Sequence, residues 1–163
     1  MRDKFLCVMA GYDETTEKLI VDIQQKLYDK GYVGNHTKNL PQHITLGTFS
    51  LDKEKSLIDL IKKVTNETRK FEITFNHIGI FEGSKVLFIG PDANYNLLQL
   101  KENFGNSFDW TPHTTMLIDD VENIMSAFPI VAKHFKAFQG QVQTIHLYEF
   151  WPTRHILSIN LVE

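Results

Sequence analysis

Hydrophobic and polar residues follow two different periods along this chain, one typical of strands and one typical of helices. The run from Phe5 to Tyr12 is almost wholly apolar, which predicts a buried strand. Between residues 14 and 30 apolar side chains recur every three or four positions, which predicts a helix that ends at Gly31. Its apolar face is formed by Leu19, Ile20, Ile23 and Leu27.

The same two periods divide the rest of the chain. Predicted strands cover residues 42–49, 71–81, 85–90, 111–118, 141–150 and 155–162, and predicted helices cover 52–68, 94–106 and 119–135. A turn at residues 82–84 joins two of the strands as a hairpin, and Asp52 is the expected cap of the second helix.

The order of these elements occurs twice. Strand, helix, strand, helix and strand follow one another from residue 5, and the same order begins again at residue 85. One duplication is too little for a solenoid, which needs three or more stacked units. We therefore expect two similar lobes, each with a sheet, in a single domain over residues 1–163.

Composition is that of a globular domain with a real core, since 42% of the 163 residues are apolar and 23% are charged. The net charge of −3 argues against a broad coat of nucleic-acid contacts, because such coats depend on Lys and Arg. A nucleic-acid partner should be held locally, at an end or a single phosphate. Cys7, the only cysteine, predicts a buried thiol in a reducing cytoplasm. The apolar run at 5–10 is too short to span a membrane.

A short pattern occurs once in each half of the chain, as His43-Ile44-Thr45-Leu46 and as His113-Thr114-Thr115-Met116. Residues i and i+2 of a strand share a face and lie about 6.6 Å apart, so each copy offers an imidazole beside a hydroxyl. Two copies supply a base, an acid and two hydrogen-bond donors. These are the groups that can open a phosphodiester without a metal.

An ordinary structural reading competes with this one, since a strand histidine is often a surface or core residue and threonine is a common strand former. The matching places of the two copies, each with a proline nearby at Pro41 or Pro112, favour a shared site. In the first copy Gly47 and Phe49 continue the face of the motif, and Phe49 is a candidate for base stacking.

The paired motifs resemble the two-histidine (2H) phosphoesterase superfamily, in its bacterial RNA 2′,5′-ligase or 2′,3′-cyclic phosphodiesterase branch. Only Thr114 departs from the usual apolar position of that pattern. The resemblance implies an α+β, bilobal fold with mainly antiparallel sheets, flanking helices and the active site in the cleft between two pseudo-symmetric lobes. It implies no metal and no cofactor. It also implies that His43 and His113 are catalytic and that Thr45 and Thr115 bind the phosphate.

Further candidates for substrate contacts are Tyr12, Phe81 and Trp151 as aromatic platforms, and Arg154 as a phosphate ligand in the last turn. For each of them core packing or an exposed turn is the alternative. His36 lies in the loop before the first motif, from which it could approach the cleft.

The function that we expect is a metal-independent phosphodiesterase that opens 2′,3′-cyclic phosphate ends of RNA or nucleotides, with 2′,5′-ligation as its reverse direction. The alternative is a non-catalytic module that binds nucleotides or RNA ends on the same fold. A metal hydrolase or a serine hydrolase is not supported, because the sequence holds no His-Glu-x-x-His and no Gly-x-Ser-x-Gly pattern. The oligomeric state is left open, with a monomer as the simplest expectation.

Overall fold

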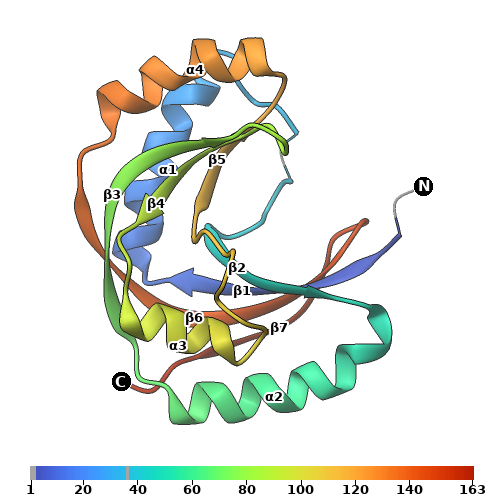
Figure 1. Cartoon of the computed structure of the whole chain (residues 1–163). Helices are drawn as coiled ribbons and strands as arrows, with labels where there is room; N and C mark the ends of the chain where they lie inside the picture. The colour runs from blue at the N-terminus through green and yellow to red at the C-terminus, as the bar shows by residue number, and fades with distance from the viewer. Residues whose placement is uncertain (1–2, 36) are drawn as a thin grey trace.

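The computed structural model describes residues 3–35 and 37–163, and its elements follow the predicted order (Figure 1). They are β1 (Phe5–Tyr12), α1 (Glu14–Tyr28), β2 (His43–Phe49), a 3-10 turn (Leu51–Lys53), α2 (Glu54–Glu67), β3 (Phe71–Phe81), β4 (Val86–Pro91), α3 (Tyr95–Glu102), β5 (Thr114–Ile118), α4 (Val121–His134), β6 (Phe138–Phe150) and β7 (Arg154–Asn160). None of the described helices is long and apolar enough to cross a membrane.

The strands form one antiparallel sheet in the order β2-β1-β6-β3-β4-β5, with β7 paired to β6 beside this path. The two halves of the chain exchange their last strands, because β3 pairs with β4 of the second half and β6 pairs with β1 of the first half. The α+β class and the doubled order are confirmed. The two expected sheets are the arms of a single sheet, joined where 71–75 pairs with 138–142.

Strand β1 is buried on both faces, as its unbroken apolar run predicts. Leu6, Val8 and Ala10 belong to the main core. Cys7 and Met9 point to the opposite face and join a small cluster with Tyr148 and Phe150 of β6. This second face of the sheet is the one that carries the motifs.

Two helices start at side-chain caps that fix where the chain leaves the sheet. The backbone N–H of Thr16 donates to Asp13 Oδ1 at 3.1 Å at the start of α1, and that of Leu97 donates to Asn94 Oδ1 at 3.0 Å at the start of α3. Asp52 is not such a cap, because it lies inside the 3-10 turn that precedes α2. Helix α3 ends at Glu102, short of the predicted 106.

Candidate active site

The two motifs occupy equivalent places at opposite ends of the strand order. In β2, His43 lies opposite Gly11 and Thr45 lies opposite Met9 of β1. In β5, Thr115 lies opposite Phe88 of β4, so that it takes the place of Thr45. His113 precedes the first residue of β5, whereas the sequence predicted a strand from residue 111.

Both motif histidines are held in the same way by the backbone two residues earlier. His43 Nδ1 lies 2.8 Å from the carbonyl oxygen of Pro41, and His113 Nδ1 lies 2.8 Å from that of Thr111. A carbonyl oxygen only accepts, so each Nδ1 carries the hydrogen. In the neutral ring Nε2 then keeps its lone pair and is available for proton transfer.

Side chains from the second half of the chain tie β5 and its preceding loop to the edge of β2. Thr114 Oγ1 donates to the His43 carbonyl oxygen at 3.0 Å, and Trp110 Nε1 donates to the Thr45 carbonyl oxygen at 3.2 Å. The sheet therefore curls until its two edge strands meet, and the motifs lie at this seam. Thr114, the one departure from the family pattern, is 1% exposed and makes the tie between them.

Tyr12 stabilises the same seam from the interior of the protein. Its hydroxyl lies 2.5 Å from Thr114 Oγ1, and because Thr114 gives its only proton to His43, Tyr12 is the donor. The Tyr12 side chain is buried, and burial raises the pKa of its hydroxyl. Tyr12 is expected to contact substrate, but in this structure its polar atom is turned into the protein and bonded to Thr114.

A β-bulge interrupts each motif strand at the fourth motif position. The register of β2 against β1 shifts between Thr45 and Gly47, leaving Leu46 without a partner, and that of β5 against β4 shifts in the same way at Met116. Because a bulge inserts one residue, the faces exchange beyond it.

The bulge corrects the expected place of Phe49. Phe49 pairs with Leu6 and packs against the main core, and its ring covers Gly47, where a Cβ would lie 2.9 Å from it. Thr48, not Phe49, extends the motif face. Gly47 therefore makes room for a core ring and not for a ligand.

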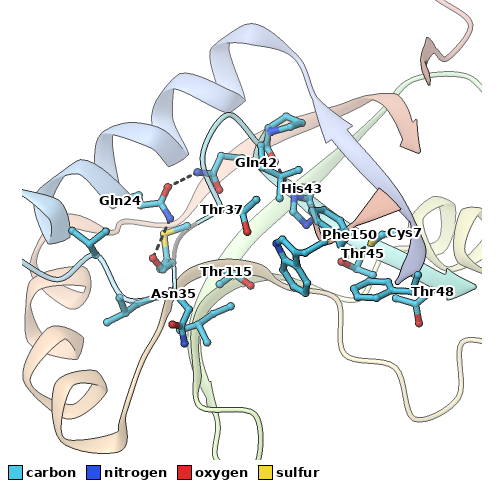
Figure 2. A pocket seen from close by; sticks show the side chains of 18 of the residues that line it. Cys7, Gln24, Asn35, Thr37, Gln42, His43, Thr45, Thr48, Thr115 and Phe150 are labelled. Atoms are coloured by element: carbon cyan, nitrogen blue, oxygen red, sulfur yellow. Dashed lines mark hydrogen bonds between the residues drawn. The ribbon is translucent and has the colours of Figure 1, made fainter. Parts of the chain in front are cut away.

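A cavity of about 330 Å³ opens beside the first motif (Figure 2). Its wall includes His43, Thr45 and Thr115, so it collects three of the four motif side chains from both halves of the chain. Trp151, which is 49% exposed, lies at its rim, and Phe150 forms part of its floor. Among the described residues that line it, none is lysine, arginine, aspartate or glutamate.

His113 lies at the seam beside the cavity and is packed among aromatic rings. The Phe81 ring meets it edge-on with centroids 4.7 Å apart, and the Phe88 ring lies 5.4 Å away. Phe81 thus lies at the site as predicted, where its ring contacts His113 and helps to hold the imidazole in place.

Burial lowers the pKa of both motif imidazoles and so favours their neutral form. Desolvation lowers the pKa of His43, a backbone bond to Pro41 opposes this, and the nearby His113 lowers the pKa further by like-charge repulsion. Desolvation likewise lowers the pKa of His113. The electrostatic coupling means that protonation of one ring disfavours protonation of the other. A pair holding a single proton is the arrangement that acid–base catalysis requires.

Arg154 is engaged with protein carboxylates and not with the cavity. Its Nε donates to Glu149 Oε2 at 2.7 Å and its Nη2 donates to Glu54 Oε2 at 2.6 Å. Lys4 reaches the other oxygen of Glu149 at 3.1 Å. This ion-pair group joins the β6–β7 turn to α2, so the proposed phosphate contact of Arg154 is not supported. His36 lies outside the described residues.

A group of polar side chains that sequence reasoning missed lines the cavity next to the motifs. Gln42 Nε2 donates to Gln24 Oε1 at 2.6 Å, and Gln24 Nε2 donates to the Met116 carbonyl oxygen at 3.0 Å (Figure 2). Asn35 and Thr37 lie on the same wall. No spacing pattern marks these residues, and only the position of Gln42 beside His43 hinted at the site.

Comparisons with known proteins agree with this fold. Residues 13–150, which contain both motifs, match the family model of the 2′-5′ RNA ligase superfamily. The crystal structure of E. coli LigT in apo form aligns over 98% of both chains, at 19% identity and a TM-score of 0.66. E. coli LigT complexed with 3′-AMP aligns over 99% of this chain and 100% of that one, at 18% identity and a TM-score of 0.64.

A more distant structure gives the same result. The protein TT0787 of Thermus thermophilus aligns over 96% of this chain and 97% of that one, at 14% identity and a TM-score of 0.61. A comparison of the sequence with individual curated proteins gives no match. At such identities the solved structures show a common fold alone.

Proposed function

The chain belongs to the 2′-5′ RNA ligase superfamily, and we propose that it is a phosphodiesterase that opens 2′,3′-cyclic phosphate ends of RNA or nucleotides without a metal. The observation that carries the proposal is the seam at which the two His-x-Thr motifs meet, tied by the bond from Thr114 to the His43 carbonyl oxygen. The two-histidine phosphoesterase resemblance drawn from the motifs agrees with this family.

The imidazole pair supplies the proton transfers. One neutral ring takes a proton from water through its free Nε2, while the protonated ring gives one to the departing ribose oxygen. Each such role contributes a factor of about 10² to 10⁴ in rate. The equal tethering of the two Nδ1 atoms to backbone carbonyls gives the rings equivalent chemistry, so 2′,5′-ligation, in which a ribose 5′-hydroxyl attacks in place of water, uses the same two groups, and their roles exchange when that ligation runs in reverse.

The two threonines complete the site as phosphate donors. Thr45 and Thr115 are half-buried and line the same cavity from opposite halves of the chain. Their hydroxyls donate to the non-bridging oxygens, whose negative charge grows in the transition state. The Thr45 hydroxyl lies 3.9 Å from the Cys7 sulfur, a weak partner that leaves it free to turn toward a phosphate.

The cavity favours a small nucleotide end over an extended polyanion. Its described lining is uncharged, and its rim offers the exposed ring of Trp151 for stacking on a base. E. coli LigT was crystallised with 3′-AMP, which is a nucleotide carrying one phosphate on its ribose. A single phosphate held by two imidazoles and two hydroxyls needs no array of lysines. The unpaired, buried thiol of Cys7 supports a reducing cytoplasm as the compartment.

The test is a panel of 2′,3′-cyclic nucleotides and 2′,5′-linked dinucleotides, assayed with EDTA present. We expect hydrolysis of the cyclic substrates by the wild type and a loss of about 10² or more in His43→Ala and in His113→Ala. Full activity in either variant would end the proposal. Tight binding of nucleotide monophosphates without any turnover would instead identify a binding module.

A further inference from the structure

A third imidazole lies behind the first motif, in a place where the opposing strand has no side chain. His146 of β6 projects onto the same face of the sheet as His43 of β2, with β1 between the two strands. On β1 the residue opposite His43 is Gly11, and a Cβ there would lie 2.3 Å from His146 Nε2. The absence of a side chain at Gly11 therefore lets the His146 ring lie over β1, at the residue that pairs with His43.

On its other side His146 is connected to the surface. Its Nδ1 lies 2.6 Å from Ser158 Oγ on β7, and the same oxygen lies 2.8 Å from Nε2 of His155. Ser158 has one proton, which it gives to His155, and it then accepts the Nδ1 hydrogen of His146. With these donors and acceptors, Nε2 of His146 carries no hydrogen and lies over Gly11. The ring of His155 is exposed, so this chain of hydrogen bonds ends at solvent.

We propose that His146, Ser158 and His155 form a proton relay between His43 and solvent, with His146 as a positioning residue for the acid–base pair. The inference rests on the proposed function, because it assigns a path for the proton that His43 gains when it acts as the base. His43 gives its Nε2 proton to Nε2 of His146. His146 releases its Nδ1 proton to Ser158 Oγ, which passes its own proton to Nε2 of His155 and on to water.

The electrostatics of His146 keep its ring neutral, so that one nitrogen can take a proton as the other releases one. Desolvation, together with repulsion from His43 and His155, lowers its pKa to about 4, so it is neutral near pH 7. The described groups that face it are His43 on β2, His155 on β7 and the Tyr148 ring 6.3 Å away on β6. Met9 and Gly11 of β1 add no charge.

A relay is needed because hydrolysis of the cyclic phosphate leaves each histidine of the pair in the protonation state opposite to the one in which it reacts. After each turnover the base has gained a proton and the acid has lost one. His43 lines the cavity that the substrate fills, so bound substrate or product covers the path from His43 to bulk water on that side. A chain of hydrogen bonds to an exposed imidazole returns the proton of His43 to water, and His113 takes a proton from water to restore the starting state.

The first arm of the test is steady-state hydrolysis of a 2′,3′-cyclic nucleotide in dilute buffer. We expect kcat to fall about tenfold in His146→Ala and in Ser158→Ala, with KM unchanged, because chemistry is intact and only proton return is slowed. Free imidazole added to His146→Ala should restore kcat. Wild-type kcat in both variants in dilute buffer would overturn the relay, as would a rise in KM alone. The exposed His134→Gln on α4 is the matched control.

The second arm needs no turnover. In an NMR titration of the histidine ring protons, the pKa of His146 should rise in His43→Gln and stay near 4 in His134→Gln. An identical His146 titration with and without His43 would overturn the inference. An inactive wild type would refute the proposed function alone, since the titration would still decide whether His146 and His43 are coupled.

Discussion

Thr114 holds His43 by its main chain, through a hydrogen bond of 3.0 Å from its side-chain hydroxyl to the histidine carbonyl oxygen. Each motif thus helps to place the other, because the donor belongs to the second motif and the acceptor to the first. The Thr114 side chain is buried, and its hydroxyl oxygen accepts a further hydrogen bond from the Tyr12 hydroxyl. An apolar residue at position 114 could not make this tie.

Thr114→Val tests this tie with almost no change in shape. It leaves the Tyr12 hydroxyl and the His43 carbonyl without their partner, at a cost of about 1–3 kcal/mol for a buried unsatisfied group. We expect the free energy of unfolding in urea to fall by that amount and kcat to fall about tenfold, since small displacements of catalytic groups are costly. Thr74→Val on the exposed side of β3 is the control. Equal kcat in the wild type and Thr114→Val would show that the tie does not place the pair.

The pH dependence of the reaction follows from the lowered pKa values of the pair. The base must be neutral, and its lowered pKa carries the acidic limb of the kcat/KM profile below 6.5, the ordinary value for histidine. The acid must be protonated, and a lowered pKa brings the alkaline limb down as well. We expect a bell-shaped profile with its maximum on the acidic side of neutrality, measured from pH 4 to 9.

A second measurement separates burial from coupling in that profile. His113→Gln removes the like charge beside His43, so the pKa of His43 should rise in an NMR titration while burial keeps it below the ordinary value. An unchanged His43 titration would show that the two rings lie too far apart to share a proton.

Sequence periodicity was enough to place the elements and the motifs, but not the face on which each side chain lies beyond them. Strict alternation puts residues 43, 45, 47 and 49 together, and the bulge at Leu46 breaks that rule. A bulge leaves no mark on the hydrophobic pattern here, because Leu46 is buried with or without it. The doubled element order was readable because each half repeats its own local periods.

The exchange of last strands between the two halves could not be predicted from the sequence, for a related reason. Local pattern identifies a strand but not its partner, and β6 is long enough to pair with β1, β3 and β7. The seam contacts of Tyr12 and Trp110 depend on that exchange. Tyr12 was a candidate for a substrate contact, and only the assembled sheet shows that its hydroxyl and the Trp110 N–H serve the motif strands.

Arg154 provides a test between a structural and a substrate role. Its contacts to Glu149 and Glu54 predict that Arg154→Gln lowers the melting temperature, because Glu149 is almost buried and would keep only Lys4 as its cation. We expect KM for a cyclic nucleotide to stay at the wild-type value, measured at a temperature at which both proteins are folded. A tenfold rise in KM with unchanged melting would restore the phosphate contact suggested by the sequence.

Trp151 is the aromatic residue at the cavity rim that we expect to stack on the base. Stacking of this kind contributes about 1–3 kcal/mol per base, so Trp151→Ala should raise KM by about 5- to 150-fold with little change in kcat. Trp151→Phe should recover part of this loss, because it keeps a flat ring at the rim. The matched control is Phe49→Ala, whose ring packs on the main core and covers Gly47. Phe49→Ala should lose stability without a change in KM. If KM instead changed in Phe49→Ala and not in Trp151→Ala, the bulge would not turn Phe49 away from the site in solution.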